Sequence, residues 1–305
     1  MMKRKLILTF LSLVILGLVW FLFFKKYDYQ INFLTKTSPG TVYSRIFAIE
    51  SWNTTKLKKN IKVIRSKVYK NVDQRVLLKD SIYQLHWELN PVNDSLTKVK
   101  VFVKDMNHSL KQRLLFLIGK SKFIKKSILF VSDFNKALNQ HLKKFKVKII
   151  GKSERPAYES IIYVTFNSDL PSKAEKMAQN IYYLMEYLRI NHIKKIGDPF
   201  INVTQWDKQK NRINAEFCFP IENLSQYPTD SIVKTKRNLK AIPALKAIYH
   251  GNYRYSDRAW FALDNYAKNH NFKVENSVLE IYYNDPHNDA EELHWKADVF
   301  MPIKN

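Results

Sequence analysis

A glutamate in the middle of an apolar strand is the residue of this sequence best suited to chemistry. Residues 278–286 read VLEIYYNDP, and their β-branched and aromatic side chains predict a β-strand that ends at Asn284-Asp285-Pro286. Glu280 interrupts this apolar run. A carboxylate that is partly desolvated in such a place has a raised pKa, so it can pair with a cation or accept a proton as a general base.

The alternation of side chains along a strand divides this run into two faces. Leu279 and Ile281 are expected to pack against Trp260 and Leu263 of the preceding predicted helix, which leaves Glu280 facing a groove. A mid-strand glutamate is also common on the solvent face of an antiparallel sheet, where it pairs with a lysine. The pattern by itself favours that plainer interpretation, so the choice depends on what surrounds the strand.

The other reactive side chains form no recognisable centre in the sequence. Cys218 is the only cysteine, and His86 and His108 have no ligand partner at metal spacing, so neither a disulfide framework nor a metal site is expected. The sequence offers no nucleophile elbow and no Ser-His-Asp arrangement, and no cofactor is expected. If the chain is an enzyme, Glu280 is its candidate catalytic residue.

The net charge of +24 lies almost wholly in the first half of the chain. Residues 1–150 contain 30 Lys and Arg residues against 8 Asp and Glu, a net +22, whereas residues 151–305 contain 21 against 19, a net +2. The sequence has no zinc-finger spacing, glycine-rich phosphate loop or RNP-like aromatic motif, so no nucleic-acid partner is expected. Membrane lipids with anionic headgroups are the expected partner of the basic half.

The N-terminus predicts a membrane anchor over residues 1–26. MMKRK is followed by nineteen residues, Leu6 to Phe24, without charge or proline. At about 1.5 Å per residue this run spans a hydrocarbon core of about 30 Å. A cleaved signal peptide would have a shorter apolar region and small residues at its cleavage site. We therefore expect a single-pass cell-membrane protein with a cytoplasmic N-terminus and an external body.

Residues 27–149 predict one α+β domain. YQINFLTKT at 29–37 reads as a strand followed by a short helix, and SIYQLHWELN at 81–90 opens a hairpin with alternating apolar and polar residues. After Leu110 the apolar period becomes helical. This order of strand, short helix, meandering sheet and long final helix resembles the START-like, or polyketide-cyclase-like (SRPBCC), helix-grip family over residues 28–148. The resemblance implies a sheet that wraps its last helix around an apolar cavity.

The last part of the chain, residues 150–305, contains an internal repeat. The matching segments are AEFCFPI at 215–221 with ADVFMPI at 297–303, and SIIYVTF at 160–166 with LKAIYHG at 245–251. Each repeat, about 155–221 and 242–303, reads strand, helix, strand, strand. Because one βαββ unit leaves an apolar sheet face uncovered, the two repeats are expected to pair around a shared surface.

The second repeat carries several spaced motifs. They are His250-Gly251-Asn252-Tyr253, Trp260 to Leu263, Glu280 to Pro286, and Pro302-Ile303. In this order they resemble the GyrI-like family, the effector-binding domain of bacterial multidrug-sensing regulators, although Asn252 stands where the family often has proline. The resemblance implies a groove between two βαββ repeats, where a carboxylate on this strand recognises cationic aromatic ligands. It therefore favours the groove interpretation of the strand glutamate.

The resemblance also indicates candidate ligand-binding residues, which are Glu280, Tyr282, Tyr249 and Trp206. The default role of each aromatic side chain remains burial in the core. Cation–π attraction from such side chains would add about 0.5–2 kcal/mol per contact. The first repeat has Ile201 or Asn202 at the equivalent place, so one carboxylate is expected in the groove.

The sequence thus predicts a membrane-anchored protein that senses or sequesters a hydrophobic or cationic aromatic small molecule. Control of transcription is not expected, because the anchor and the basic domain stand where such regulators have a helix-turn-helix. The alternative is a hydrolase of electrophilic small molecules, as some GyrI-like proteins are, with Glu280 as general base. Glu280→Gln is expected to leave folding little changed or slightly improved, because a desolvated carboxylate is itself unfavourable.

Overall fold

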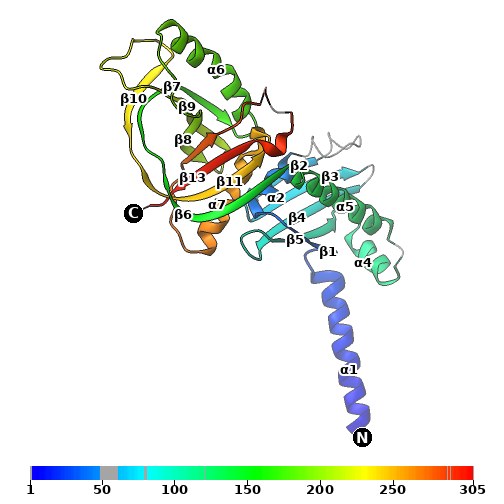
Figure 1. Ribbon diagram of the computed structural model, residues 1–305. Coiled ribbons are helices and arrows are strands. Elements are labelled where there is room, and N and C mark those ends of the chain that lie inside the picture. The colour runs from blue at the N-terminus through cyan, green and yellow to red at the C-terminus, as the bar shows by residue number, and fades with distance from the viewer. Residues whose placement is uncertain are drawn as a thin grey trace. The chain divides into compact units, whose positions relative to one another are not determined.

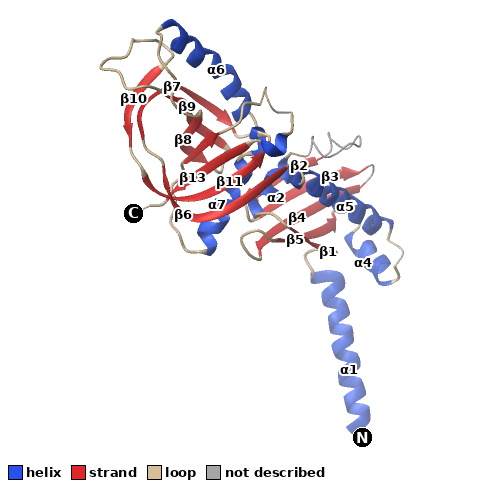
Figure 2. Cartoon of the chain, in the orientation of Figure 1, coloured by secondary structure: helices blue, strands red, loops and turns tan. Residues whose placement is uncertain are grey.

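The computed structural model describes residues 2–48, 61–78, 81–119, 121–286, 288 and 290–304. Within these residues the fold is α+β, with two antiparallel sheets and an N-terminal apolar helix, which confirms the predicted fold class (Figure 2). The chain divides into two compact units. Met1–Val92 with Leu96–Asn139 forms the first unit, and Asn93–Ser95 with Gln140–Asn305 forms the second.

The N-terminal helix consists of α1 (Met2–Val19) and a π-helical last turn, Trp20–Phe24. The most apolar 18-residue window of the run Met2–Phe24 has a mean hydropathy of 2.8, and the run is long and apolar enough to cross a membrane. None of its described side chains is buried against the protein. Apart from the last turn, where the Phe21 ring lies 6.3 Å from that of Phe116, the described apolar surface of this helix is exposed.

The first unit contains a five-stranded antiparallel sheet in the order β1-β5-β4-β3-β2 (Figure 1). Its strands are β1 (Tyr29–Thr35), β2 (Ile61–Lys67), β3 (Asn71–Leu78), β4 (Ser81–Pro91) and β5 (Thr97–Asp105). Its helices are α2 (Pro39–Phe47), α4 (Ser109–Leu117) and α5 (Lys122–Leu142).

The alternation in the β4–β5 hairpin determines which face of this sheet is covered. Trp87 is wholly buried, and its ring lies 4.8 Å from that of Phe134 on helix α5. Its indole nitrogen donates to Gln74 Oε1 at 2.9 Å, which satisfies the polar atom inside the core. Phe102 points to the opposite face, where its ring lies 5.3 Å from that of Tyr27. The tryptophan thus fills the space between the sheet and the long helix.

The second unit contains an eight-stranded antiparallel sheet in the order β10-β7-β9-β8-β12-β13-β11-β6. Its strands are β6 (Phe145–Arg155), β7 (Tyr158–Asp169), β8 (Phe200–Asp207), β9 (Arg212–Pro220), β10 (Lys234–Leu239), β11 (Ile242–Gly251), β12 (Val278–Tyr282) and β13 (Lys296–Pro302). Its helices are α6 (Lys173–Ile190) and α7 (Asp257–Asn269).

The strands of the two repeats are arranged symmetrically about the centre of this sheet. One half reads β7-α6-β8-β9 along the chain and the other reads β11-α7-β12-β13, so both repeats have the βαββ order. The halves meet where β8 pairs with β12, with Val203 opposite Val278 and Ile201 opposite Glu280. Strand β12, which carries the candidate glutamate, is therefore a central strand at the seam between the repeats.

The packing of helix α5 on the first sheet can be tested. Phe134→Ala should lower the free energy of unfolding by about 3–5 kcal/mol, because the truncated ring leaves a cavity against Trp87. Lys136→Ala, at an exposed position of the same helix, should change it by less than about 0.5 kcal/mol. Chemical denaturation measures both variants, and equal effects would contradict this packing.

Candidate functional site

Glu280 lies inside the protein and faces helix α7. The side chain has no exposed surface, and its Oε1 accepts a hydrogen bond from the indole nitrogen of Trp260. Leu279 and Ile281 instead belong to an apolar cluster on the other face of the sheet. The expectation that the aliphatic face packs against Trp260 was therefore wrong. Both faces of this central strand are covered, so its alternation could not show which one meets the helix.

A lysine from the first repeat pairs with this glutamate. Lys173, the first residue of helix α6, places its Nζ 2.8 Å from Glu280 Oε2. Neither side chain has any exposed surface. The same ammonium lies 4.8 Å from the centre of the Trp260 ring, within the range of a cation–π contact. The site therefore already holds a cation between a carboxylate and an aromatic face.

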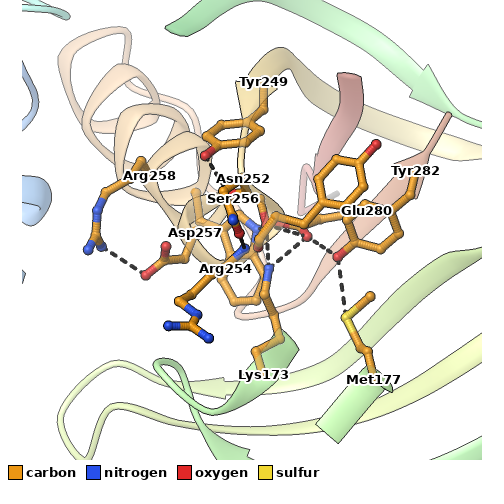
Figure 3. Close-up of polar contacts among 12 residues, drawn as sticks. Lys173, Met177, Tyr249, Asn252, Arg254, Ser256, Asp257, Arg258, Glu280 and Tyr282 are labelled. Carbon is orange, nitrogen blue, oxygen red and sulfur yellow. Dashed lines mark hydrogen bonds and ion pairs between the residues drawn. The ribbon is translucent and has the colours of Figure 1, made fainter. Parts of the chain in front are cut away.

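Further donors complete the hydrogen bonding of the carboxylate (Figure 3). Ser256 Oγ donates to Glu280 Oε2 at 2.8 Å and accepts from Lys173 Nζ at 2.5 Å. The Tyr282 hydroxyl also donates to Oε2. Together with the indole of Trp260, these groups supply donors to both oxygens, which is the arrangement that a buried charge requires.

The surroundings of this centre favour the neutral phenol of Tyr282. Burial, reinforced by the neighbouring Glu280 charge, raises the pKa of the Tyr282 hydroxyl well above its usual value. The phenol therefore keeps its proton and remains a donor to the carboxylate. Burial also raises the pKa of Asp257, while the adjacent Arg258, whose Nη1 lies 2.9 Å from Asp257 Oδ2, opposes that rise.

Two of the predicted ligand residues lie outside the contacts of this carboxylate. Trp206 is buried and packs edge-on against the Trp260 ring at 5.4 Å, so one ring separates it from Glu280. Tyr249 is also buried, and its hydroxyl donates to the carbonyl of Asn252 at 2.8 Å. That bond closes the turn after β11, where Gly251 has a φ of +142° and an added Cβ would lie 2.8 Å from Lys144 O.

The sequence interpretation missed Lys173 and Ser256. Lys173 lies on the same helical stripe as Met177, Leu184 and Leu188, all of which are buried. The available signal was the position of a lysine on an otherwise apolar helical stripe. Its charge is opposite to that of Glu280, the one charged residue in the apolar strand. No comparable signal marked Ser256, which lies in the turn before α7 and whose contact with Glu280 depends on the tertiary fold.

An open pocket lies on the opposite face of the same sheet. It has a volume of about 400 Å³, and Ile281, Tyr283 and Phe300 contribute to its walls. Asp298 also lines it and pairs with Lys246 at 2.7 Å. Glu280 is separated from this pocket by the thickness of the sheet. Among the residues that the structure describes, no group of three or more His, Cys, Asp and Glu side chains could hold a metal ion.

Comparison with known proteins gives similarities of shape at low sequence identity. No protein-family model and no curated protein matches the chain. The C-terminal domain of EcmrR is 16% identical, with a TM-score of 0.42, over 53% of this chain and 98% of that one. A hydrolase encoded by lin2189 from Listeria innocua is 12% identical, with a TM-score of 0.30, over 53% of this chain and 92% of that one. The di-domain ARO/CYC protein StfQ is 7% identical, with a TM-score of 0.22, over 90% of this chain and 85% of that one. At these values the similarities carry no functional argument for the chain.

The ion pair gives a direct test by substitution. Lys173→Met and Glu280→Gln, each alone, should lower the free energy of unfolding by about 3–5 kcal/mol, because the remaining charge is buried without its partner. The double variant should recover most of that loss, and Lys176→Met on the same helix should cost less than about 0.5 kcal/mol. Denaturant unfolding of the four variants gives the coupling energy.

Additive effects of the two single substitutions would contradict the pairing. This expectation reverses the one drawn from the sequence for Glu280→Gln. The sequence expectation counted only the desolvation of the carboxylate, whereas the structure adds a buried cation, the Lys173 ammonium, at 2.8 Å.

Proposed function

We propose that this chain is a membrane-anchored small-molecule-binding protein, which senses or sequesters a hydrophobic, cationic ligand at Glu280. The ligand's charged group would take the place of the Lys173 ammonium. The observation that carries this proposal is the cation already held there, 2.8 Å from the carboxylate and 4.8 Å from the Trp260 ring centre. A carboxylate with an aromatic wall is the chemistry that recognises organic ammonium groups.

The position of the centre between the two repeats supports this proposal. Lys173 and Met177 come from helix α6 of the first repeat, whereas Glu280, Tyr282 and Trp260 come from the second. A ligand that replaced the lysine would therefore contact both repeats. Its binding would be coupled to the position of α6, which is the property that a sensing domain needs.

The location of Lys173 on its helix favours exchange. It is the first residue of α6, where the helix dipole places partial positive charge and disfavours a cation. The preceding Ser172 makes no side-chain cap bond to the helix. The ion pair with Glu280 therefore offsets the unfavourable interaction of the lysine with the helix dipole. A ligand that supplied its own cation would let the lysine swing out to water.

The hydrolase alternative requires a rearrangement before any chemistry. A general base must reach water or substrate, but both oxygens of Glu280 accept hydrogen bonds and the side chain has no exposed surface. Removal of Lys173 from the carboxylate would be its first step. The binding proposal requires the same exchange and no further chemical group, so it is the function that this geometry supports best.

Binding can be tested with benzylammonium, which joins an ammonium to one aromatic ring. In the Lys173→Ala background, which vacates the space of the lysine side chain, the probe should bind and raise the melting temperature, because it restores the missing cation. Adding Glu280→Gln should weaken that binding by about 1–3 kcal/mol, the cost of losing a charged hydrogen-bond partner. Isothermal titration and thermal unfolding measure the two effects.

Benzyl alcohol, similar in shape but uncharged, is the matched control and should bind both variants equally. Equal affinity of benzylammonium for Lys173→Ala with and without Glu280→Gln would refute recognition of a cation by this carboxylate. A turnover assay with the wild-type chain and Glu280→Gln addresses hydrolysis separately.

The proposed membrane anchor can be tested separately from ligand binding. The apolar run Met2–Phe24 should keep the full-length protein in the membrane fraction through washing with alkaline carbonate. Purely electrostatic attachment by the basic half would be lost under high salt, because exposed charges are screened. Recovery of the protein in the soluble fraction after either wash would remove the anchor from the proposal.

A further inference from the structure

A buried arginine fastens helix α4 to the end of the N-terminal apolar helix. Arg113, only 3% exposed, donates from Nη1 to the carbonyls of Phe21 and Leu22, at 2.9 and 2.8 Å. Its Nη2 donates to the carbonyl of Lys25, and its Nε donates to Asp28 Oδ1 at 2.9 Å. The guanidinium thus satisfies carbonyls that the last turn of a helix leaves without partners.

These hydrogen bonds of Arg113 form a clamp that fixes the level of helix α4 relative to the apolar helix. Phe21 and Leu22 lie in the last turn of the apolar run, immediately before Lys25 and Lys26. The Phe116 ring of α4 also lies 6.3 Å from the ring of Phe21. If Met2–Phe24 crosses a bilayer, α4 is held where the hydrocarbon ends and the headgroups begin.

Helix α4 exposes an apolar face at this level. Leu110, Leu114 and Leu117 recur with steps of four and three, and their exposed fractions are 43%, 49% and 53%. Ile118, just after the helix, is 61% exposed. Arg113 follows Leu110 by three positions and precedes Leu117 by four, so the buried arginine borders the leucine face of the helix. Water-exposed leucines in a row are unfavourable unless another apolar medium covers them.

Basic side chains accompany this apolar face. Lys111 on α4 and Lys122, Lys125 and Lys126 on the first turns of α5 are all exposed. Asp105 is the acidic group nearest in sequence to α4, but it is buried and accepts hydrogen bonds from Gln112 and from the backbone before α4. An exposed apolar face beside lysines is the pattern of a helix that lies in a membrane interface.

We propose that helix α4 and the first turns of α5 form a second membrane contact, an interfacial one. The leucine face (Leu110, Leu114 and Leu117) enters the boundary between headgroups and acyl chains, and the neighbouring lysines contact anionic headgroups. Arg113 acts as the positioning residue that holds this contact beside the anchor. The inference rests on the proposed membrane anchoring and adds to it a defined lipid-binding surface.

A lipid surface fits this face better than a protein partner does. The clamp places helix α4 next to the end of Met2–Phe24, whose exposed apolar surface has lipid as its proposed solvent. The lysines match anionic headgroups, each of which contributes favourable attraction near the surface. A protein partner would have to cover the leucines while competing with the bilayer at the same level.

The test uses the full-length chain in vesicles that contain anionic lipid. A polarity-sensitive fluorophore is attached to Leu114→Cys, and in a second protein to Val92→Cys, which is 55% exposed at the far turn of the β4–β5 hairpin. The native Cys218 is buried and shielded from the label. The label at 114 should show blue-shifted emission and be quenched by nitroxide lipids, whereas the label at 92 should resemble one in water.

A further variant links the signal to the leucine face. With the label at Leu117→Cys, the added pair Leu110→Asp and Leu114→Asp should abolish the blue shift and the quenching, while carbonate still fails to extract the protein. A carbonate-resistant protein whose label at 114 stays unquenched would overturn the interfacial contact alone. Extraction by carbonate would instead overturn the anchor on which it depends.

Discussion

The ion pair between Lys173 and Glu280 is the interaction on which the second unit depends. Two charges without any exposed surface are costly to remove from water, and their attraction offsets that cost only where hydrogen bonds satisfy both partners. Ser256, Tyr282 and Trp260 supply those hydrogen bonds here. The β8–β12 pairing joins the two repeats in one sheet, and the ion pair also ties helix α6 of the first repeat to strand β12 of the second.

The same interaction restricts what a ligand must be. Lys173 is tethered to the site, so its ammonium competes at a high effective concentration with any free cation. A simple ammonium ion could not displace it, because it would offer the same charge without additional contacts. A ligand with an apolar or aromatic body also gains contact with Met177 and the Trp260 ring. Under the proposed function, hydrophobic cations would therefore satisfy this constraint, and small hydrophilic cations would not.

Sequence reasoning succeeded where one local pattern decides the structure, and failed where two distant segments meet. The β4–β5 alternation and the βαββ order of both repeats were visible in the sequence, but the covered face of the hairpin, which carries Trp87, came from the structure. The sequence did not show which face of β12 packs against helix α7, because a strand that is covered on both sides carries apolar residues on both faces. Lys173 lies 107 positions before its partner, so only the fold reveals the pair. Likewise, nothing near Arg113 in the sequence indicates the carbonyls of Phe21 and Leu22.

The uneven charge of the chain would give the proposed membrane contact a role in stability. The first 150 residues hold 30 basic and 8 acidic side chains, so most of their cations have no acidic partner in that half. Arg113 is an exception, because it forms a buried ion pair with Asp28. The unpaired lysines repel one another, and this repulsion opposes the compact state. Anionic headgroups beside α4 would neutralise part of that charge. The membrane would then stabilise the basic unit as well as hold it in place.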